Sequence, residues 1–295
     1  MSLKILMFGE TGQVATEMRR RAGPDLVIEA LGRQAADLTD PEACAARIAA
    51  TDANVVVNAA AYTAVDQAEE DLATAMVVNA EAPGAMAAAA ASRGLPFLHI
   101  STDYVFDGSG TEPWSEDAPT APLGVYGLSK LAGEERVTAA GGPHAILRTA
   151  WVHAAHGKNF LRTMLRLGAE RDRLTIVEDQ RGGPTAAGDI ADALITMAGA
   201  QAERRGPSGI YHFCGAPAVS WHGFATAIFE AAGMADRVEV APIPSSAFPT
   251  KAPRPANSVL NCSKIHADYG ILQPDWRQSM ARILADLADL EGKAP

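Results

Sequence analysis

Short apolar runs alternate with helical segments through the first half of the chain. The apolar runs are Leu3–Phe8, Leu26–Leu31, Val55–Val57, Pro96–Ser101 and Ala145–Arg148. Between them lie segments with the spacing typical of helices, namely Gly12–Ala22, Leu72–Arg93 and Gly127–Ala140. Buried strands joined by helices form right-handed βαβ units. The pattern therefore predicts an α/β protein with a Rossmann-type, doubly wound parallel sheet.

The alternation is weaker beyond residue 150. Leu174–Val177 and Ile210–Phe213 are predicted strands, whereas Asp189–Met197, Trp221–Ala232 and Ser279–Leu290 are predicted helices. Five prolines between Pro242 and Pro255 predict a loop there. We expect an NAD(P)-binding domain over residues 1–150, with 182–205 packing back onto it. Residues 151–181 and 206–295 are expected to form mainly a smaller α/β lobe that binds substrate.

Composition narrows the classes of function. The net charge of −10 disfavours nucleic acid and anionic membranes as partners. No apolar run approaches the roughly 20 residues that span a bilayer, and no signal peptide is evident, so we expect a cytoplasmic protein. The three cysteines form no C-x-x-C pair, which disfavours a zinc site or a disulfide scaffold.

A glycine-rich segment directly follows the first predicted strand. It reads Gly9-Glu10-Thr11-Gly12-Gln13-Val14-Ala15, with the spacing G-x-x-G-x-x-A. Glycines permit a tight turn and close backbone approach to a pyrophosphate, and the next helix directs its N-terminal amides at the phosphates. A strand-to-helix turn without ligand is the alternative. The segment predicts dinucleotide binding by Gly9, Thr11, Gly12, Gln13 and Val14.

The end of the second predicted strand bears on the choice of cofactor. It reads Ala30-Leu31-Gly32-Arg33, without the acid that usually binds the ribose of NAD. Arg33 can pair with a 2′-phosphate in bidentate geometry, so NADPH is favoured and NADH is the alternative. Asp37 and Leu38 fit an adenine-contacting edge, although Asp37 suits a turn equally well.

Small residues follow the third predicted strand, where a flat cofactor can lie against the backbone. They are Ala59, Ala60 and Ala61, followed by Tyr62. Asn79, in the next predicted helix, either supports these strand ends or is simply a polar residue on a helix face. We expect all five residues to belong to the cofactor site.

The candidate catalytic residues are Thr102, Tyr126 and Lys130. Tyr126 and Lys130 are four residues apart, so on a helix they share a face. A nearby ammonium lowers the pKa of a phenol, which is ordinarily about 10, and makes it a better general acid. Thr102 ends the fourth predicted strand, where its hydroxyl can hold a substrate carbonyl beside Tyr126.

The order of these segments resembles the extended short-chain dehydrogenase/reductase superfamily. The shared signatures are the glycine loop, Asn58-Ala59-Ala60, the segment from Ser101 to Gly108, and Tyr126-x-x-x-Lys130. Within that superfamily the chain most resembles the dTDP-4-dehydrorhamnose reductase family. The stretches that carry this resemblance are Gly12–Val14, Ala60–Glu69, Tyr126–Glu134, Leu147–Val152 and Asp179–Thr185.

The resemblance implies that NAD(P)H reduces the C4 ketone of dTDP-4-dehydro-β-L-rhamnose to give dTDP-β-L-rhamnose, a donor for cell-surface polysaccharides. It implies that Tyr126 donates the proton, Lys130 holds the nicotinamide ribose and Thr102 binds the carbonyl. It places the sugar against Thr63, Val65, Thr102, Asp103, Tyr104 and Trp151. Arg181, with Lys251 and Arg254, is a candidate for the pyrophosphate or thymine side, because an anion needs donors.

Some members of this family hold Mg²⁺ with carboxylates at a subunit interface. Glu17 and Asp189 are the candidates here, but Gly188 stands where a further acid is expected. We therefore predict no essential metal, and a homodimer is left open.

Two other functions remain open. A nucleotide-sugar epimerase of the same superfamily would keep NAD tightly bound, and Arg33 and the region of Trp151 argue against it. A non-catalytic, NADP-binding regulatory subunit, a role known among relatives of this family for methionine adenosyltransferase, need not keep Thr102, Tyr126 and Lys130 together. The presence of all three argues against that function.

Overall fold

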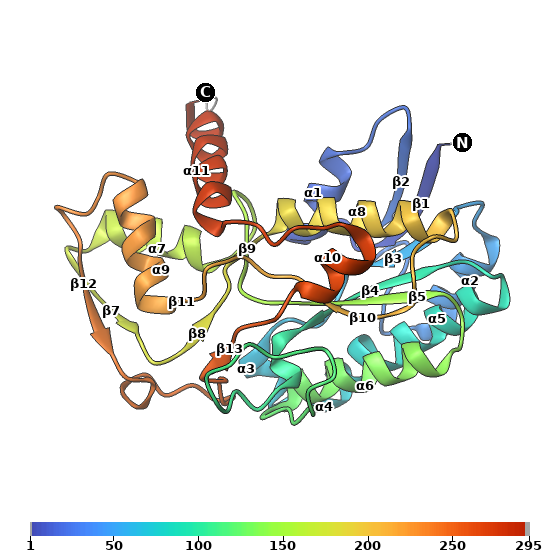
Figure 1. The fold of residues 1–295 in the computed structure, drawn as a ribbon, viewed down its shortest axis with the longest axis horizontal. Helices are drawn as coiled ribbons and strands as arrows, with labels where there is room; N and C mark the ends of the chain where they lie inside the picture. Colours follow the sequence, from blue (N-terminus) through green and yellow to red (C-terminus); the bar gives the residue numbers. More distant parts are fainter. Residues whose placement is uncertain (1, 293–295) are drawn as a thin grey trace.

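The computed structural model describes residues 2–292, and a six-stranded sheet forms its larger part (Figure 1). The strands lie in the order β10-β5-β4-β3-β1-β2, and every neighbouring pair is parallel. Their bounds are β1 (Leu3–Phe8), β2 (Leu26–Leu31), β3 (Val55–Asn58), β4 (Phe97–Thr102), β5 (His144–Thr149) and β10 (Gly209–His212).

The chain crosses from one half of the sheet to the other between β2 and β3. From β1 it moves outward to β2, and it then returns past β1 to β3, β4 and β5. In such sheets ligands bind at the carboxyl ends of the strands, where the winding reverses. That point lies between β1 and β3, whose last residues Phe8 and Asn58 pair in register. The predicted doubly wound fold is confirmed.

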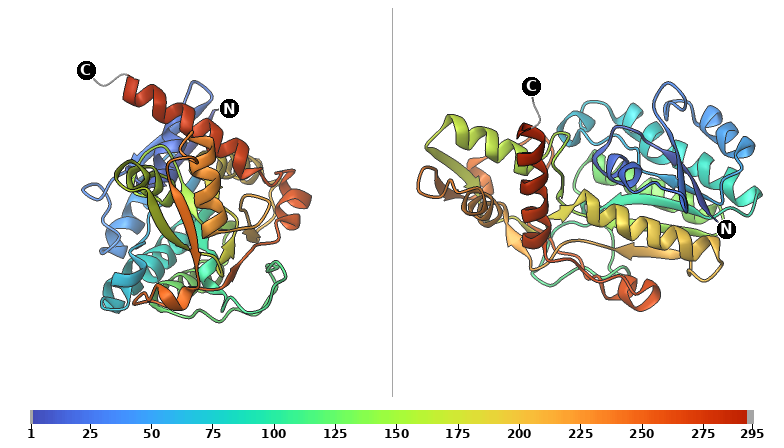
Figure 2. Two further views of the ribbon diagram at one scale, coloured as in Figure 1. Left: turned by 90° about the vertical axis from the view of Figure 1, so that its left-hand side faces the viewer. Right: turned by 90° about the horizontal axis from the view of Figure 1, so that it is seen from above.

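Helices cover both faces of the sheet, as the view from above in Figure 2 shows. One face carries α1 (Gln13–Arg20) and α8 (Ala187–Ala202), which pack on it through a shared apolar core. The other face carries α2 (Pro41–Ala50), α5 (Ala82–Ser92) and α6 (Val125–Ala139) over a second core. Asp40 caps the start of α2, because its side chain accepts a hydrogen bond from the amide of Ala43 at 3.0 Å.

A smaller lobe with its own apolar core lies at one end of the sheet (Figure 1). It contains α7 (Phe160–Glu170), β7 (Arg173–Val177), α9 (Trp221–Ala231) and β12 (Glu239–Ile243), and β12 pairs with β7 in parallel. Short strands join lobe and sheet: β6 (Val152–His153), β8 (Arg181–Gly182), β9 (Thr185–Ala186), β11 (Val219–Ser220) and β13 (Asn257–Ser258). The last part of the chain also contains α10 (Ser263–Tyr269), α11 (Trp276–Gly292) and a short 3-10 turn η3 (Ser245–Ala247).

The structure differs from the sequence prediction at one place in the second half. β10 lies in the main sheet beside β5, which the prediction of residues 206–295 as mainly lobe leaves open. Pro242 belongs to β12 instead of a loop, since a strand with one free edge tolerates a missing amide. The 182–205 segment, which contains α8, does lie on the sheet, while the exact division into domains stays a prediction.

The predicted helix Leu72–Arg93 is continuous but changes its winding. It consists of α4 (Leu72–Met76), a π-helical turn η1 (Val77–Glu81) and α5. Such π turns within α-helices occur frequently at functional sites. This one contains the buried Asn79. No helix within residues 2–292 is long and apolar enough to cross a bilayer.

Candidate active site

The glycine loop forms a cradle between β1 and α1. Gly9 has a φ of 110°, which favours glycine, and a Cβ there would meet the backbone of Ala59 at 3.2 Å. Gly12 precedes α1, and no side chain caps the first amides of that helix. Free amides at a helix N-terminus beside an open backbone suit a pyrophosphate. The residues of this chain therefore fit the dinucleotide that the sequence predicts.

The other predicted residues of the loop have distinct surroundings. Thr11 is exposed at the cradle, whereas the side chain of Val14 is buried in the core, so that only its backbone can face a ligand. The Oε1 atom of Gln13 accepts a hydrogen bond from Asn159 at 2.8 Å. Gln13 thus ties the loop to the segment that leads into α7.

The end of β2 presents one cation and one anion. Arg33 is exposed, and the carboxylate of Glu10 lies directly against Gly32. Asp37 accepts a hydrogen bond from the amide of Thr39 at 2.9 Å, which lowers the pKa of its carboxyl group, and Leu38 is buried. The structure thus places Asp37 in a turn. The position of Glu10 was not predicted, because the loop and the strand end are far apart in sequence.

Asn79 supports the segment that follows β3. Its Oδ1 accepts from the amide of Tyr62 at 2.8 Å, and its Nδ2 donates to the carbonyl of Tyr62 at 3.1 Å and to Ser129 Oγ at 3.0 Å. Asn79 is therefore held away from solvent, in the supporting position that the sequence suggests. It links the segment of Ala59, Ala60 and Ala61 to α6.

Thr102 and Tyr126 lie close together at the carboxyl edge of the sheet. Thr102 ends β4 and is buried, and Tyr126 lies in the first turn of α6. A hydrogen bond with Thr102 lowers the pKa of the Tyr126 phenol, but burial outweighs it and raises that pKa to about 12. The close approach of α6 depends on Gly127, where a Cβ would collide with the carbonyl of Tyr104.

Lys130 points to β4. Its Nζ donates to the carbonyl of Ile100 at 2.7 Å and lies 3.1 Å from His99 Nε2. Burial lowers the pKa of Lys130 to about 8, although the charge of Glu134 opposes this. Lys130 is not among the groups that shift the pKa of Tyr126. The predicted lowering of the Tyr126 pKa by Lys130 therefore stays a prediction for the protein with its cofactor.

Helix α6 is held at three points along its length. At its start, Glu69 Oε1 accepts from the amide of Val125 at 2.8 Å, so a carboxylate stabilises the helix N-terminus. In its middle, Ser129 bonds Asn79. In its second half, Glu134 forms a fully buried ion pair with Arg148, with a shortest distance of 2.6 Å. Asn79 was predicted to belong to the cofactor site. Glu69 and Arg148 were not predicted, because each lies outside the helix that it holds.

Asp103 is a buried carboxylate beside Thr102. Its Oδ1 accepts from Thr102 Oγ1 at 3.0 Å, while Oδ2 has no hydrogen-bond partner within residues 2–292. Burial raises the pKa of Asp103 to about 6, against lowering by hydrogen bonds with Ser258 and Thr102. The ring of Tyr104 packs edge-on against that of Tyr126, with centroids 5.6 Å apart.

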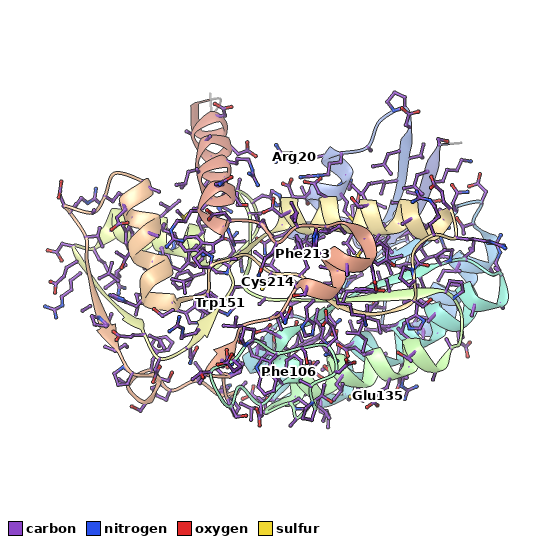
Figure 3. All side chains as sticks on the ribbon, in the orientation of Figure 1. Arg20, Phe106, Glu135, Trp151, Phe213 and Cys214 are labelled. Atoms are coloured by element: carbon purple, nitrogen blue, oxygen red, sulfur yellow. The ribbon has the colours of Figure 1, made fainter. Side chains whose placement is uncertain are left out.

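Trp151 lies at the junction of sheet and lobe (Figure 3). It has a φ of 50°, which is rare for a bulky residue and typical of functional sites. Its ring stacks on Trp221 of α9 with centroids 3.5 Å apart and packs directly on Gly182. The structure thus adds Trp221, which the sequence analysis missed, to the surroundings of Trp151.

The three candidate cations have different positions. Arg254 donates to Asp66 at 2.9 Å, lies 5.9 Å from the Tyr104 ring centroid, and has a buried Nη1 without a partner among the described residues. Lys251 forms an exposed ion pair with Glu70, and Arg181 is exposed on β8. Arg254 alone of the three is tied to the Tyr104 and Tyr126 pair.

Thr63 lies on the segment between β3 and α3 (Val65–Ala68), and Val65 is the first residue of α3. Thr63 is exposed and Val65 is half-buried. Asp66, the partner of Arg254, follows directly. The structure therefore brings this segment to the same side of the molecule as Arg254.

The carboxylates considered for Mg²⁺ are engaged by cations of the chain. Glu17 is paired with Arg20 at 3.0 Å, Arg21 at 2.9 Å and His156 at 2.8 Å. Asp189 is paired with Arg282 at 2.7 Å. The described part of the chain contains no group of three metal-ligating side chains. These donors do not fit a magnesium ion, and the lack of an essential metal stays a prediction.

The fold, the glycine cradle and the Thr102, Tyr126 and Lys130 set are those of an NAD(P)-dependent oxidoreductase with a Rossmann fold. The family model described as RmlD substrate binding domain matches residues 3–289. A dTDP-4-dehydrorhamnose reductase of Burkholderia thailandensis is 48% identical, over 97% of this chain and 99% of that protein. The chain belongs to the dTDP-4-dehydrorhamnose reductase family.

Other relatives agree with this assignment. The dTDP-4-dehydrorhamnose reductase of Escherichia coli is 38% identical over 97% of this chain and 98% of that protein. The crystal structure of the Bacillus anthracis enzyme in complex with NADP has a TM-score of 0.91 and 31% identity, and it covers 97% of this chain and 100% of its own. The resemblance seen in the sequence is thus confirmed over the whole chain.

Proposed function

We propose that this protein reduces the C4 ketone of dTDP-4-dehydro-β-L-rhamnose to dTDP-β-L-rhamnose with NAD(P)H. The observation that carries the proposal is the pairing of Thr102 and Tyr126 at the carboxyl edge of the sheet, next to the glycine cradle. Family membership narrows the ketone to that of a nucleotide-linked deoxysugar.

The two hydroxyl groups divide the work on the ketone oxygen. When bound, NAD(P)H supplies the hydride. Thr102 turns its one hydroxyl hydrogen from Asp103 Oδ1 to the carbonyl oxygen of the substrate. Tyr126 gives its phenolic proton to the same oxygen as negative charge develops there. A tyrosine whose pKa is about 12 keeps its proton at neutral pH, so it is available as the donor.

The surroundings of the site suit a nucleotide sugar. Asp103 Oδ2 is a buried acceptor without a partner among the described residues, as a sugar hydroxyl requires. The stacked Trp151 and Trp221 provide an apolar wall for the methyl group of a deoxysugar. The partnerless Nη1 of Arg254 suits the pyrophosphate, in preference to Arg181 or Lys251.

The end of β2 supports use of both cofactors, with NADPH preferred. The exposed Arg33 can pair with a 2′-phosphate, whereas Glu10 beside Gly32 can accept from a free 2′-hydroxyl. We expect Arg33→Ala to weaken NADPH binding and leave NADH binding nearly unchanged, and Glu10→Gln to do the converse. Dissociation constants for both cofactors, measured on both variants, check this assignment.

The decisive experiment follows NADPH consumption with enzymatically prepared dTDP-4-dehydro-L-rhamnose. We expect Tyr126→Phe to bind NADPH normally and to lose turnover by a factor of about 10² or more. Tyr269→Phe on α10 removes the same hydroxyl outside the site and serves as the control. Reduction by Tyr126→Phe at nearly the rate of the unchanged protein would show that Tyr126 is not the proton donor.

The same preparation distinguishes the other functions. Purified protein with bound, non-exchanging NAD⁺ would indicate an epimerase. Tight NADPH binding without oxidation by any dTDP-4-keto sugar would indicate a regulatory subunit. A cytoplasmic location, a homodimer and the absence of nucleic-acid and membrane partners stay predictions.

A further inference from the structure

Three buried polar side chains form a line from the sheet to the catalytic helix. Asn58 ends β3, and His99 is its neighbour in register on β4. Asn58 Nδ2 lies 3.1 Å from His99 Nδ1, and His99 Nε2 lies 3.1 Å from Lys130 Nζ. Asn58 and His99 are fully buried and Lys130 is 2% exposed, so water does not satisfy these groups.

The direction of the hydrogen bonds starts at Asn58. Its Oδ1 lies 3.1 Å from the backbone amide of Ala60, and that amide can only donate. The carbonyl end of the Asn58 side chain must therefore face Ala60, and the NH₂ end must face His99. If the amide of Asn58 were turned over, its NH₂ group would face the N–H group of Ala60. Both groups are donors, so neither would have an acceptor.

The orientation of Asn58 determines the tautomer of His99. Because Asn58 Nδ2 donates, His99 Nδ1 must accept and carries no hydrogen. A neutral imidazole then has its hydrogen on Nε2, which faces Lys130. Burial, followed by the charge of Lys130, lowers the pKa of His99 well below its ordinary value, which keeps the ring neutral.

The Nε2–H group of His99 needs an acceptor at Lys130. An ammonium has three donors and no lone pair, so it would oppose the Nε2–H group across 3.1 Å. A neutral amine accepts from Nε2–H and still donates to the carbonyl of Ile100, which lies 2.7 Å away. Each of the four contacts in the line then joins one donor to one acceptor.

We propose that His99, with its tautomer set by Asn58, is a positioning residue that holds the amino group of Lys130 in place and favours its neutral form. Protonation of Lys130 requires His99 to move its hydrogen to Nδ1 and Asn58 to give up one of its two bonds. The proton affinity of Lys130 is thus coupled to Asn58 on β3, which does not contact Lys130 itself.

The other charges around Lys130 do not determine its protonation in place of His99. Glu134 on the same helix favours the ammonium, but Arg148 on β5 neutralises it in a buried ion pair. The remaining ionisable groups lie on α6 itself and on the elements packed against it. They are Tyr126, Glu135 and Arg136 on α6, Asp66 on α3, Glu81 on η1, Asp103 and Tyr104 on the 3-10 turn η2 (Asp103–Val105), and His144 on β5. The lowering of the Lys130 pKa to about 8 by burial agrees with the proposed coupling.

The tautomer can be observed directly. Long-range ¹H–¹⁵N correlation spectra, recorded at a pH above the expected Lys130 midpoint of about 8 so that the amine is neutral, distinguish a ring protonated at Nε2 from one protonated at Nδ1. The chain has seven histidines, and the spectrum of His99→Gln identifies the signal of His99 by its loss. We expect the Nε2–H form. The Nδ1–H form would overturn the proposal, and because no substrate is needed, this result does not depend on the proposed function.

Two variants test the coupling to Lys130. In Asn58→Asp both side-chain oxygens accept, so His99 turns its Nδ1–H to the carboxylate and offers Nε2 as an acceptor. In His99→Gln the amide oxygen can accept from Lys130. Both changes favour the ammonium, and we expect each to raise the pH midpoint of Lys130 by about one unit or more, a tenfold change in the ammonium-to-amine ratio.

The midpoint is read from the pH dependence of the NADPH dissociation constant, followed by the fluorescence of the four tryptophans. For the unchanged protein we expect it near pH 8. His144→Gln is the control, because it makes the same replacement at the opposite end of β5 from the site. It should leave the pH midpoint of NADPH binding unchanged. This binding measurement rests on the proposed function, because it requires that Lys130 contacts the cofactor.

A purely structural role for His99 would give a different result. It would lower the melting temperature of the variants and leave the pH midpoint where it was. Variants that fold, as judged by melting temperature and circular dichroism, with an unmoved midpoint would overturn the proposal. If NADPH binding shows no transition in any form, the ¹⁵N signals of the lysine Nζ groups give the same midpoint without cofactor.

Discussion

Asp103→Asn is expected to make the protein more stable at pH 8 and less active. The carboxyl group of Asp103 is 2% exposed, and among the described residues its close side-chain donors are the hydroxyl groups of Thr102 and Ser258. No cation within residues 2–292 offsets its charge, so the folded state disfavours ionisation. Asparagine has the same shape, keeps the acceptor for Thr102 and carries no charge.

The magnitude follows from the raised pKa. Burial raises the pKa of Asp103 from 3.8 to about 6 in the folded state. At 1.36 kcal/mol for each pKa unit, ionisation lowers the free energy of unfolding by about 3 kcal/mol. Because the folded pKa is the higher one, the stability is fully present below pH 3.8, falls as the pH rises through 6, and stays low above it.

Urea unfolding of both proteins at pH 8 and at pH 4 checks this. We expect Asp103→Asn to be more stable by about 3 kcal/mol at pH 8 and by less than about 1 kcal/mol at pH 4. Its KM for the keto sugar should rise, because Nδ2 replaces the acceptor Oδ2. A stability difference that is the same at both pH values would show that ionisation of buried Asp103 does not destabilise the protein.

Further variants test the anchoring of α6 and the metal. Arg148→Met leaves Glu134 buried without its cation and should cost about 3–5 kcal/mol in urea unfolding. Adding Glu134→Gln should restore part of the lost stability. If the double variant lost as much stability as Arg148→Met alone, the buried charge of Glu134 would not be the cause. Glu69→Gln weakens the cap of α6 and should cost about 0.5–1 kcal/mol, again in urea unfolding. EDTA should leave turnover unchanged, because Glu17 is already paired with cations. If EDTA abolished turnover and Mg²⁺, but no other metal ion, restored it, the protein would need Mg²⁺.

The local elements could be predicted because their signals are local. The apolar runs Leu3–Phe8 and Leu26–Leu31 coincide with β1 and β2. Asp40 and Pro41, residue types that favour a helix start, begin α2. The glycine spacing likewise predicts the turn before α1. Each signal depends on a few adjacent residues, so distant parts of the fold do not alter it.

The departures from prediction come from contacts between distant segments. The π turn inside Leu72–Arg93 puts Asn79 between Tyr62 and Ser129, which are 17 and 50 residues away. Pro242 enters a strand because β7 lies on one side of it only. Periodicity contains no information on either pairing, so the sequence predicts a plain helix and a plain loop.

The candidate site divides in the same way. Thr102, Tyr126 and Lys130 could be predicted from their places at a strand end and on one helix face. His99, Glu69 and Glu10 could not, because their roles depend on the element that each side chain faces. The only sequence signal for His99 is a polar residue inside an otherwise apolar strand, which needs a buried partner.

Helix α6 differs from α8 in how the sheet holds it. The buried side of α8 is apolar, with Ile190, Leu194 and Met197 among its residues, whereas that of α6 consists of glycines and polar residues except for Val137. Apolar packing is non-directional and tolerates small slips, while hydrogen bonds demand particular distances and angles.

A slip of α6 by one residue would rotate Tyr126 by about 100° away from Thr102. The same slip would break the bonds of Ser129, Lys130 and Glu134 together and leave their partners buried without hydrogen bonds. Each such loss costs about 1–3 kcal/mol, and more for the charged pair. The polar groups on this helix therefore exclude the registers in which the proton donor would face away from the ketone.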